Sequence, residues 1–261
     1  MTREKLAFLF LMITDSKATS IWRRFFQGVD PTQYTRYCHT KRPPQDSFWQ
    51  QCHIRRRIPT RWGDISLVQA TLLLLQEALT DCHNQYFVLL SDSCIPIVDF
   101  QLLARQLRHR GQSWIHYKHI ENRTTRYQQL GLGIKQKLPW SRFYSQHQWT
   151  ILRRSHALQI LQMTPTYLPY FRKVHAVDEH YLVTLLWLAG VLETECYNHK
   201  ITYCDWSDRT KSHPATFKVI SDQLVELAQS QGNFFLRKVA DNCRIGPYLN
   251  YILDSTSTAK D

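Results

Sequence analysis

Apolar and polar stretches alternate along the chain in the way that is typical of an α/β fold. Residues 6–13 are an apolar run of strand length, residues 16–27 carry apolar side chains at helical spacing, and residues 34–39 form another strand-like run. These segments predict a strand–helix–strand unit at the start of the chain. The first run also fits the apolar core of a signal peptide, although it is much shorter than the ~20 residues that a spanning helix needs.

The next part of the chain predicts the centre of the sheet. Residues 67–79 form a strong helical pattern with four consecutive leucines, and residues 86–90 are an apolar strand. A strand that is apolar on both faces is typical of the middle of a parallel sheet. Ligands in such sheets bind beyond the carboxyl ends of the strands. We therefore expect Asp92, which directly follows this strand, to lie beside a ligand.

The remaining pattern predicts one domain with a short tail. Further helices are expected at residues 100–110, 155–162 and 221–229, and further strands at residues 113–117, 148–152, 194–197 and 201–204. The basic, proline-containing stretch at residues 41–61 fits a loop over a site or a solvated run of charge, and residues 121–144 fit a mobile or substrate-facing insertion. The overall expectation is an α/β domain over residues 1–254, with a mostly parallel central sheet flanked by helices, and a disordered tail over residues 255–261.

Charge narrows the possible ligands. The 261 residues include 33 Lys and Arg against 21 Asp and Glu, a net charge of +12, so the surface attracts anions such as nucleotides, nucleic acids or acidic glycans. The seven cysteines form no CxxC pair, which argues against a structural zinc site. We expect mostly reduced cysteines, with one or two disulfides if the protein matures in an oxidising compartment.

The stretch around Glu179 is the strongest candidate for chemistry. Asp178 is a good N-cap, apolar residues recur through Ala189, and Gly190 follows as a stop signal, so a helix is predicted to open at Asp178. Glu179 would then lie in the first turn, where the helix dipole favours an ionised carboxylate suited to act as a general base. Both acids also fit a role that is limited to capping the helix.

Several common catalytic patterns are absent. The Gly131-Leu132-Gly133 pair lacks the third glycine of a dinucleotide-binding loop and does not follow a predicted strand. The twelve histidines form no HExxH motif, and no G-x-S-x-G elbow occurs. These absences argue against Rossmann, P-loop, zincin and α/β-hydrolase chemistry.

Seven motifs, in order between residues 5 and 239, carry a family resemblance. They are KLAFLFL at 5–11, RWG at 61–63 followed by SLVQA at 66–70, LLSDSCIP at 89–96, DEHY at 178–181, TYCDWS at 202–207, HPATF at 213–217 and FLRK at 235–238. The set resembles the core-2/I-branching β-1,6-N-acetylglucosaminyltransferase family, called glycosyltransferase family 14, and its plant branch.

The resemblance implies a GT-A-like fold and an inverting transfer of N-acetylglucosamine, xylose or glucuronic acid from a UDP-sugar to a glycan hydroxyl, forming a β-linkage. It also implies that no metal ion or other cofactor is needed. Glu179 matches the family's base, which favours the catalytic interpretation over the capping one. An inverting transfer is a single in-line displacement, so one carboxylate has to take the acceptor proton while the nucleotide leaves from the other face of the sugar.

The leaving diphosphate has to be stabilised by a metal ion or by fixed cations. A D-x-D metal motif is absent, since Asp92 is followed by Ser93 and Cys94. Arg237 and Lys238 can replace it, and Lys238 is in register with a family lysine that binds diphosphate, although the pair also fits a solvated basic surface. The family's second cation, an arginine, would fall near Ala215. The residues that could substitute for it are Lys218 and Lys211.

Other positions match the donor and acceptor sides of the family's site. On the donor side these are His39, Arg61, Trp62, Ser66 and Asp92, together with the basic residues above. On the acceptor side these are Trp206, Asp178 and Asp205. An aromatic face such as that of Trp206 can stack on the apolar face of a pyranose, although the residue also fits a core position.

Two other classes of function remain open from sequence. A nucleic-acid-binding protein fits the charge and the aromatic residues interleaved with Arg and Lys over residues 114–144, but leaves the ordered motifs unexplained. A degenerate relative that binds glycans without transfer is disfavoured by the presence of Glu179. Because no stretch is long enough for a membrane anchor, we expect a soluble or cytoplasmic protein, of bacterial or viral origin.

Overall fold

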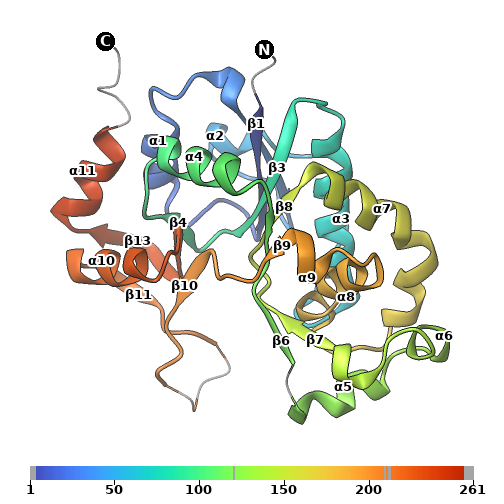
Figure 1. Cartoon of the computed structure of the whole chain (residues 1–261). Coiled ribbons are helices and arrows are strands. Elements are labelled where there is room, and N and C mark those ends of the chain that lie inside the picture. Colours follow the sequence, from blue (N-terminus) through green and yellow to red (C-terminus); the bar gives the residue numbers. More distant parts are fainter. Residues whose placement is uncertain (1–3, 120, 209, 211–212, 256–261) are drawn as a thin grey trace.

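A six-stranded sheet forms the centre of the computed structural model, which describes residues 4–119, 121–208, 210 and 213–255 (Figure 1). The strand order is β2-β1-β3-β8-β5-β9. The strands are β1 (Lys5–Met12), β2 (Tyr34–Thr40), β3 (Asn84–Ser91), β5 (Ser113–Trp114), β8 (Ile151–Arg153) and β9 (Cys196–Tyr197). β1 is parallel to β2 and β3, and β5 is parallel to β9, whereas β8 is antiparallel to both of its neighbours. The expected mixed α/β fold with a mostly parallel sheet is confirmed.

The opening strand–helix–strand unit is also confirmed. β1 is buried from Leu6 to Met12, so the first apolar run is a core strand. Helix α1 (Thr19–Phe26) places Trp22 against Phe10, with ring centroids 4.9 Å apart in an edge-to-face arrangement. Burying one such large side chain contributes roughly 1.5–3 kcal/mol, so this unit anchors the sheet on which the candidate site is built.

Helices cover both faces of this sheet (Figure 1). Helices α3 (Ile65–Leu79) and α7 (Arg154–Tyr167) pack on one face, and α1 and α4 (Phe100–Arg110) lie on the other. Residues 100–110 were predicted as a helix, and both of its ends have caps: Asp99 accepts a hydrogen bond from the Leu102 N–H, and Gly111 adopts the left-handed conformation. The other α-helices are α2 (Ser47–Gln50), α5 (Thr124–Gln128), α6 (Leu132–Lys135), α8 (Tyr181–Leu188), α9 (Leu192–Glu195), α10 (Asp222–Ser230) and α11 (Pro247–Ser255).

The remaining strands form three small sheets. They are β10 (Thr202–Cys204), β12 (Phe235–Arg237) and β4 (Cys94–Pro96); β11 (Phe217–Ile220) with β13 (Val239–Ile245); and β6 (Tyr117–His119) with β7 (Tyr144–Gln146). The strand predicted at residues 113–117 is therefore split between two sheets. The strands predicted at 194–197 and 201–204 also separate, because the Ile201 carbonyl accepts from the Phe234 and Phe235 N–H groups and draws the chain to β12.

The helix predicted to open at Asp178 begins three residues later. Residues Val177–Glu179 form a 3-10 turn, η5, and α8 starts at Tyr181 with His180 at its N-cap position. The turn starts from Ala176, whose φ of 48° is left-handed and whose N–H donates to the Gly63 carbonyl. The predicted capping role of Asp178 is wrong, since its side chain makes no cap hydrogen bond to the helix. The other 3-10 turns are η1 (Pro31–Gln33), η2 (Glu121–Arg123), η3 (Trp140–Arg142) and η4 (Leu168–Phe171).

Three irregular regions also bear on the expectations. The basic stretch at 41–61 is mostly loop, but α2 within it buries Trp49 completely. The insertion at 121–144 packs Leu130, Ile134 and Leu138 into the core. Helix α11 extends to Ser255, and the rest of the expected tail lies outside the described residues. All seven cysteines are free thiols.

Candidate active site

Two adjoining cavities lie at the carboxyl ends of the central strands. The first, of about 230 Å³, is called here the strand-end cavity, and the second, of about 220 Å³, the Glu179 cavity. Polar and charged residues that line only the strand-end cavity are Lys17, His39, Lys41, Asp92 and Ser93. Those that line only the Glu179 cavity include Gln146, His147, Asp178, Glu179, Trp206 and His213. Both cavities are lined by Trp62, Gln148, Trp149, Arg237 and Lys238, so the two form one continuous cleft.

Arg237 and Lys238 lie where the two cavities meet. Arg237 ends β12, and its guanidinium carbon lies 4.9 Å from the Trp149 ring centroid, while its Nε donates to the Ser91 hydroxyl at 3.3 Å. The pKa of Lys238 is lowered, first by burial and then by the positive charges of Arg237 and Lys17, against the opposing effect of Asp92. Positive groups that repel one another here would be stabilised by a bound anion.

The sequence-based assignment missed Lys17. Its backbone N–H donates to the Asp92 carbonyl at 2.9 Å, and its ammonium group lies 3.7 Å from an Asp241 carboxylate oxygen. Asp92 directly follows β3, whereas Lys17 lies five residues beyond Met12, the last residue of β1. The strand-end rule points to the segment after β1 but does not by itself select Lys17 within it.

Three donor-side predictions lie at the strand-end cavity. His39, in β2, is buried, and its Nε2 accepts from the Ile58 N–H at 3.1 Å, while burial lowers its pKa. Asp92 lines the same wall, and Trp62 spans both cavities with 77% of its surface exposed.

Other donor-side predictions are not brought to these cavities. The Arg61 N–H donates to the Ser66 hydroxyl at 3.0 Å, and both residues line a separate cavity. Lys218 is exposed on β11 and lines neither cavity. Lys211 lies outside the described residues.

Glu179 is held by an arginine that the sequence-based assignment also missed. Arg126 in α5 places its Nη1 2.5 Å from Glu179 Oε2 and 3.1 Å from His180 Nε2. The His180 Nδ1 lies 2.8 Å from the Tyr144 carbonyl oxygen, which can only accept, so Nδ1 carries the proton and Nε2 accepts from Arg126. The His180 ring is buried and stacks on Phe143. Segments 53 residues apart thus fix the carboxylate at the cavity wall.

Asp178 is the second acid of the Glu179 cavity, and its environment disfavours its charge. Its Oδ1 is buried and has no hydrogen-bond partner among the described residues. Burial, and then the neighbouring Glu179 carboxylate, raise the pKa of Asp178 to about 6. Glu179, by contrast, is paired with Arg126, so of the two adjacent acids it is the one with a bound cation.

We expect Asp178→Asn to change the pH dependence of stability. The Asp178 pKa is about 6 in the folded chain and 3.8 when unperturbed, so ionising this carboxyl group in the folded chain lowers stability. The loss of stability is absent below about pH 4 and is complete once the pH has risen through 6. The variant has no such loss. Its free energy of unfolding relative to the natural chain should rise by roughly 2–3 kcal/mol between pH 4 and pH 7.5. Urea unfolding at both pH values measures this; a difference that does not depend on pH would contradict it.

The acceptor-side predictions Trp206 and Asp205 take different positions. Trp206 lines the Glu179 cavity with 49% of its surface exposed, so its ring is open to a ligand. Asp205 does not line the cavity; its carboxylate accepts from the Ser207 N–H at 2.8 Å, and its carbonyl accepts from the Ala215 N–H. Asp205 therefore shapes the loop that presents Trp206.

Among the residues that the structure describes, the side chains that are grouped closely enough to share a metal ion lie away from the cleft. Within the described ranges, the one group of three His, Cys or acidic side chains close enough to share an ion is Asp81, Cys82 and His83. This group precedes β3, at the opposite end of the strand from Asp92, and Asp81 is already paired with Lys5 at 2.8 Å.

Comparisons with known proteins identify the family of the chain. The model of the Core-2/I-Branching enzyme family matches residues 6–231. Glycosyltransferase BC10 of Oryza sativa subsp. japonica is 26% identical over 266 residues, which cover 87% of this chain and 65% of the rice protein. Among solved structures, the crystal structure of A197 from STIV matches with a TM-score of 0.34 and 11% identity, over 74% of this chain and 80% of that one.

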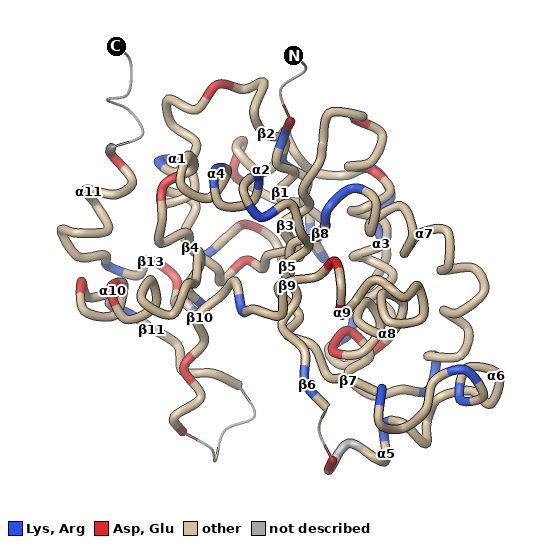
Figure 2. Tube along the Cα trace, viewed as in Figure 1, with Lys and Arg blue, Asp and Glu red and all other residues tan. Residues whose placement is uncertain are grey.

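No helix within the described residues has both the length and the apolar character that crossing a lipid bilayer requires. Basic residues are spread over α1, α4, β6 and α6 (Figure 2).

Proposed function

The chain belongs to the Core-2/I-branching enzyme family, and we propose that it is an inverting glycosyltransferase that moves a sugar from a UDP-sugar to a glycan hydroxyl. The observation that carries the proposal is the continuous cleft, with a carboxylate in one part and lysine and arginine side chains where the parts meet. An in-line displacement needs a base on one side of the sugar and an anion-stabilising group on the other. Glu179 and the Arg237-Lys238 pair supply these two groups. The proposal includes a GT-A-like fold.

On the donor side, the strand-end cavity would hold the nucleotide. His39 lines this cavity and not the Glu179 cavity, so it would face the nucleoside, and Lys17, Arg237 and Lys238 would contact the diphosphate. Charge-assisted hydrogen bonds from fixed cations can stabilise the leaving diphosphate in the role that a metal ion has in other transferases. The donor sugar is N-acetylglucosamine, xylose or glucuronic acid in this proposal.

On the acceptor side, Glu179 would take the proton of the attacking hydroxyl and Trp206 would stack on the acceptor pyranose. Arg126 would act as a positioning residue, since its ion pair fixes the carboxylate against the cavity. The acceptor hydroxyl would attack the anomeric carbon of the donor sugar from the Glu179 side, the bond to the diphosphate would break, and a β-linkage would form. Relative to the α-linked donor, the configuration is inverted.

We expect nucleotide binding and transfer without a divalent metal ion, because the cleft offers clustered cations and no gathered metal ligands among the described residues. Calorimetric titration of UDP into the full chain should give the same affinity in EDTA as in Mg²⁺ or Mn²⁺. A screen of UDP-sugars in EDTA should then identify one donor that is hydrolysed or transferred.

A strict requirement for Mn²⁺ or Mg²⁺ would contradict metal-independent transfer and point to Asp92 as a ligand. Weak UDP binding together with strongly salt-dependent oligonucleotide binding would instead favour the nucleic-acid-binding alternative.

A further inference from the structure

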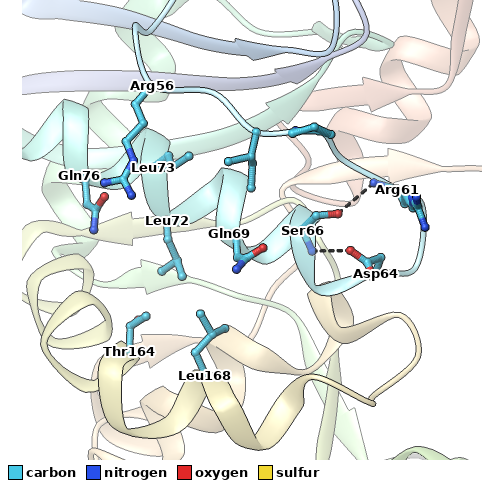
Figure 3. Close-up of a pocket in the computed structure, with 12 residues that line it drawn as sticks. Arg56, Arg61, Asp64, Ser66, Gln69, Leu72, Leu73, Gln76, Thr164 and Leu168 are labelled. Carbon is cyan, nitrogen blue, oxygen red and sulfur yellow. Dashed lines mark hydrogen bonds between the residues drawn. The ribbon is translucent and has the colours of Figure 1, made fainter.

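A groove that is separate from the Glu179 cavity, and whose larger part Figure 3 shows, is lined by Arg61 and Asp64, on either side of Trp62 and Gly63. It joins a cavity of about 570 Å³ and another of about 390 Å³, which share Gln69, Thr164 and Leu168. Its walls are the loop at residues 56–61 and helices α3 and α7. We call it the α3–α7 groove. At 570 Å³, its larger part alone has the volume of a ligand site.

The groove combines cations with hydrogen-bonding and apolar groups. Arg56 and Arg172 lie in its two cavities, and neither makes an ion pair within the part of the chain that the structure describes. In Figure 3 the Arg56 guanidinium extends toward the Gln76 amide. Gln69 and Leu72 line the floor. A ligand that is anionic, rich in hydrogen-bonding groups and partly apolar on its faces would complement such a surface.

Among the described residues, Asp64 is the one acidic residue that lines the groove, and its carboxylate is already hydrogen-bonded. Asp64 accepts a hydrogen bond from the Ser66 N–H at 2.8 Å as the N-cap of α3. The pKa of Asp64 is lowered first by a hydrogen bond with the Ser66 side chain, then by the capping bond from the Ser66 N–H, and to a smaller extent by the charge of Arg61. The groove as a whole therefore keeps an excess of positive charge.

The groove begins one residue away from the candidate active site. Trp62 and Gly63 line the Glu179 cavity, whereas their neighbours Arg61 and Asp64 line the groove. The Gly63 carbonyl accepts from the Ala176 N–H at 2.8 Å, so this turn is held against the segment that carries Glu179. The exposed Trp62 ring stands at the border. To reach the groove, a chain of sugars that leaves the Glu179 cavity would have to cross the turn at Trp62 and Gly63.

We propose that the α3–α7 groove binds an acidic glycan, a sugar chain bearing carboxylate or sulfate groups, as the continuation of the acceptor in the Glu179 cavity. This inference rests on the proposed function. Arginine pairs well with carboxylate and sulfate oxygens, and the Gln and Thr side chains can bond to hydroxyls. Single-stranded nucleic acid fits less well, because bases are bound by stacking on aromatic rings and none lines the groove among the described residues.

The test is equilibrium binding of labelled oligogalacturonate, which carries a carboxylate on every sugar, to the full chain without any donor. Arg56→Gln/Arg172→Gln removes one cation from each cavity and should weaken binding by roughly tenfold, the effect of losing two partly exposed charge-assisted contacts. The matched control is Arg55→Gln/Arg105→Gln, which makes the same change in net charge at exposed positions that do not line the groove. The control should bind like the natural chain, and a neutral dextran oligosaccharide of equal length should bind more weakly than oligogalacturonate.

If both double variants bind oligogalacturonate equally weakly, the result contradicts binding in the groove and indicates attraction to the positive charge of the whole surface. If dextran binds as tightly as oligogalacturonate, the ligand does not have to be acidic. If an oligonucleotide binds more tightly than oligogalacturonate, and Arg56→Gln/Arg172→Gln abolishes that binding, the groove is a nucleic-acid site. Measuring UDP affinity on the same samples separates the two proposals. If the natural chain binds UDP but Arg56→Gln/Arg172→Gln binds oligogalacturonate normally, only the proposed role of the groove is contradicted. If the natural chain does not bind UDP, the proposed function is contradicted.

Discussion

Glu179→Gln is expected to lower the turnover of sugar transfer by roughly 10²- to 10⁴-fold, the usual contribution of a general base. Gln is nearly the same size and can still accept a hydrogen bond from Arg126, which lies 2.5 Å from Glu179 in the natural chain. It cannot take the acceptor proton. Because the nucleotide would bind in the strand-end cavity, UDP affinity should stay unchanged. Steady-state kinetics with the donor found in the UDP-sugar screen, together with UDP calorimetry, measure both quantities.

The chain offers a matched control for this variant. Glu193 forms a comparable ion pair with Arg142 at 2.6 Å, but it lies outside both cavities. Glu193→Gln should therefore leave turnover within about twofold of the natural value, since a surface ion pair contributes little. If Glu179→Gln keeps near-normal turnover while Asp178→Asn abolishes it, the two neighbouring acids have the opposite roles.

Strands and helices could be predicted wherever burial determines the pattern of apolar and polar residues. The apolar run at residues 86–90 became the core of β3, between β1 and β8, because a strand covered on both faces has no polar face to alternate with. The short strands could not be assigned to sheets in this way. β9 and β10 are separated by a few residues and differ little in pattern, but contacts of residues near 201 with residues 234–235 decide that they lie in different sheets.

The site residues that belong to a motif or follow a strand end could be predicted from the sequence. Glu179, Trp206, Arg237 and Lys238 do line one cleft. Arg126 could not be predicted, because its partner is 53 residues away and no periodicity links an irregular insertion to a distant turn. The burial of Asp178 was missed for a related reason. Its capping role was inferred from residue type alone, whereas the left-handed Ala176 sets the direction of the turn.

Lys238→Ala is expected to weaken UDP binding by roughly tenfold to a hundredfold, since a charge-assisted contact to phosphate contributes about 1.5–3 kcal/mol. Lys238 lies where the two cavities meet, and its lowered pKa reflects burial and the neighbouring cations Arg237 and Lys17. Removing one of these cations leaves less positive charge to stabilise the leaving diphosphate, so transfer should slow as well. Calorimetry in EDTA measures the affinity, and single-turnover kinetics measure the transfer step.

Lys218→Ala is the matched control, because it removes the same charge from an exposed position on β11 that lines neither cavity. It should bind UDP within about twofold of the natural chain, as expected for a solvated surface charge. If Lys218→Ala weakens UDP binding as much as Lys238→Ala does, the phosphate contact extends to β11, and Lys218 replaces the family's second cation after all. If neither variant weakens it, the diphosphate does not lie at the junction of the cavities, and the donor has to be placed elsewhere in the cleft.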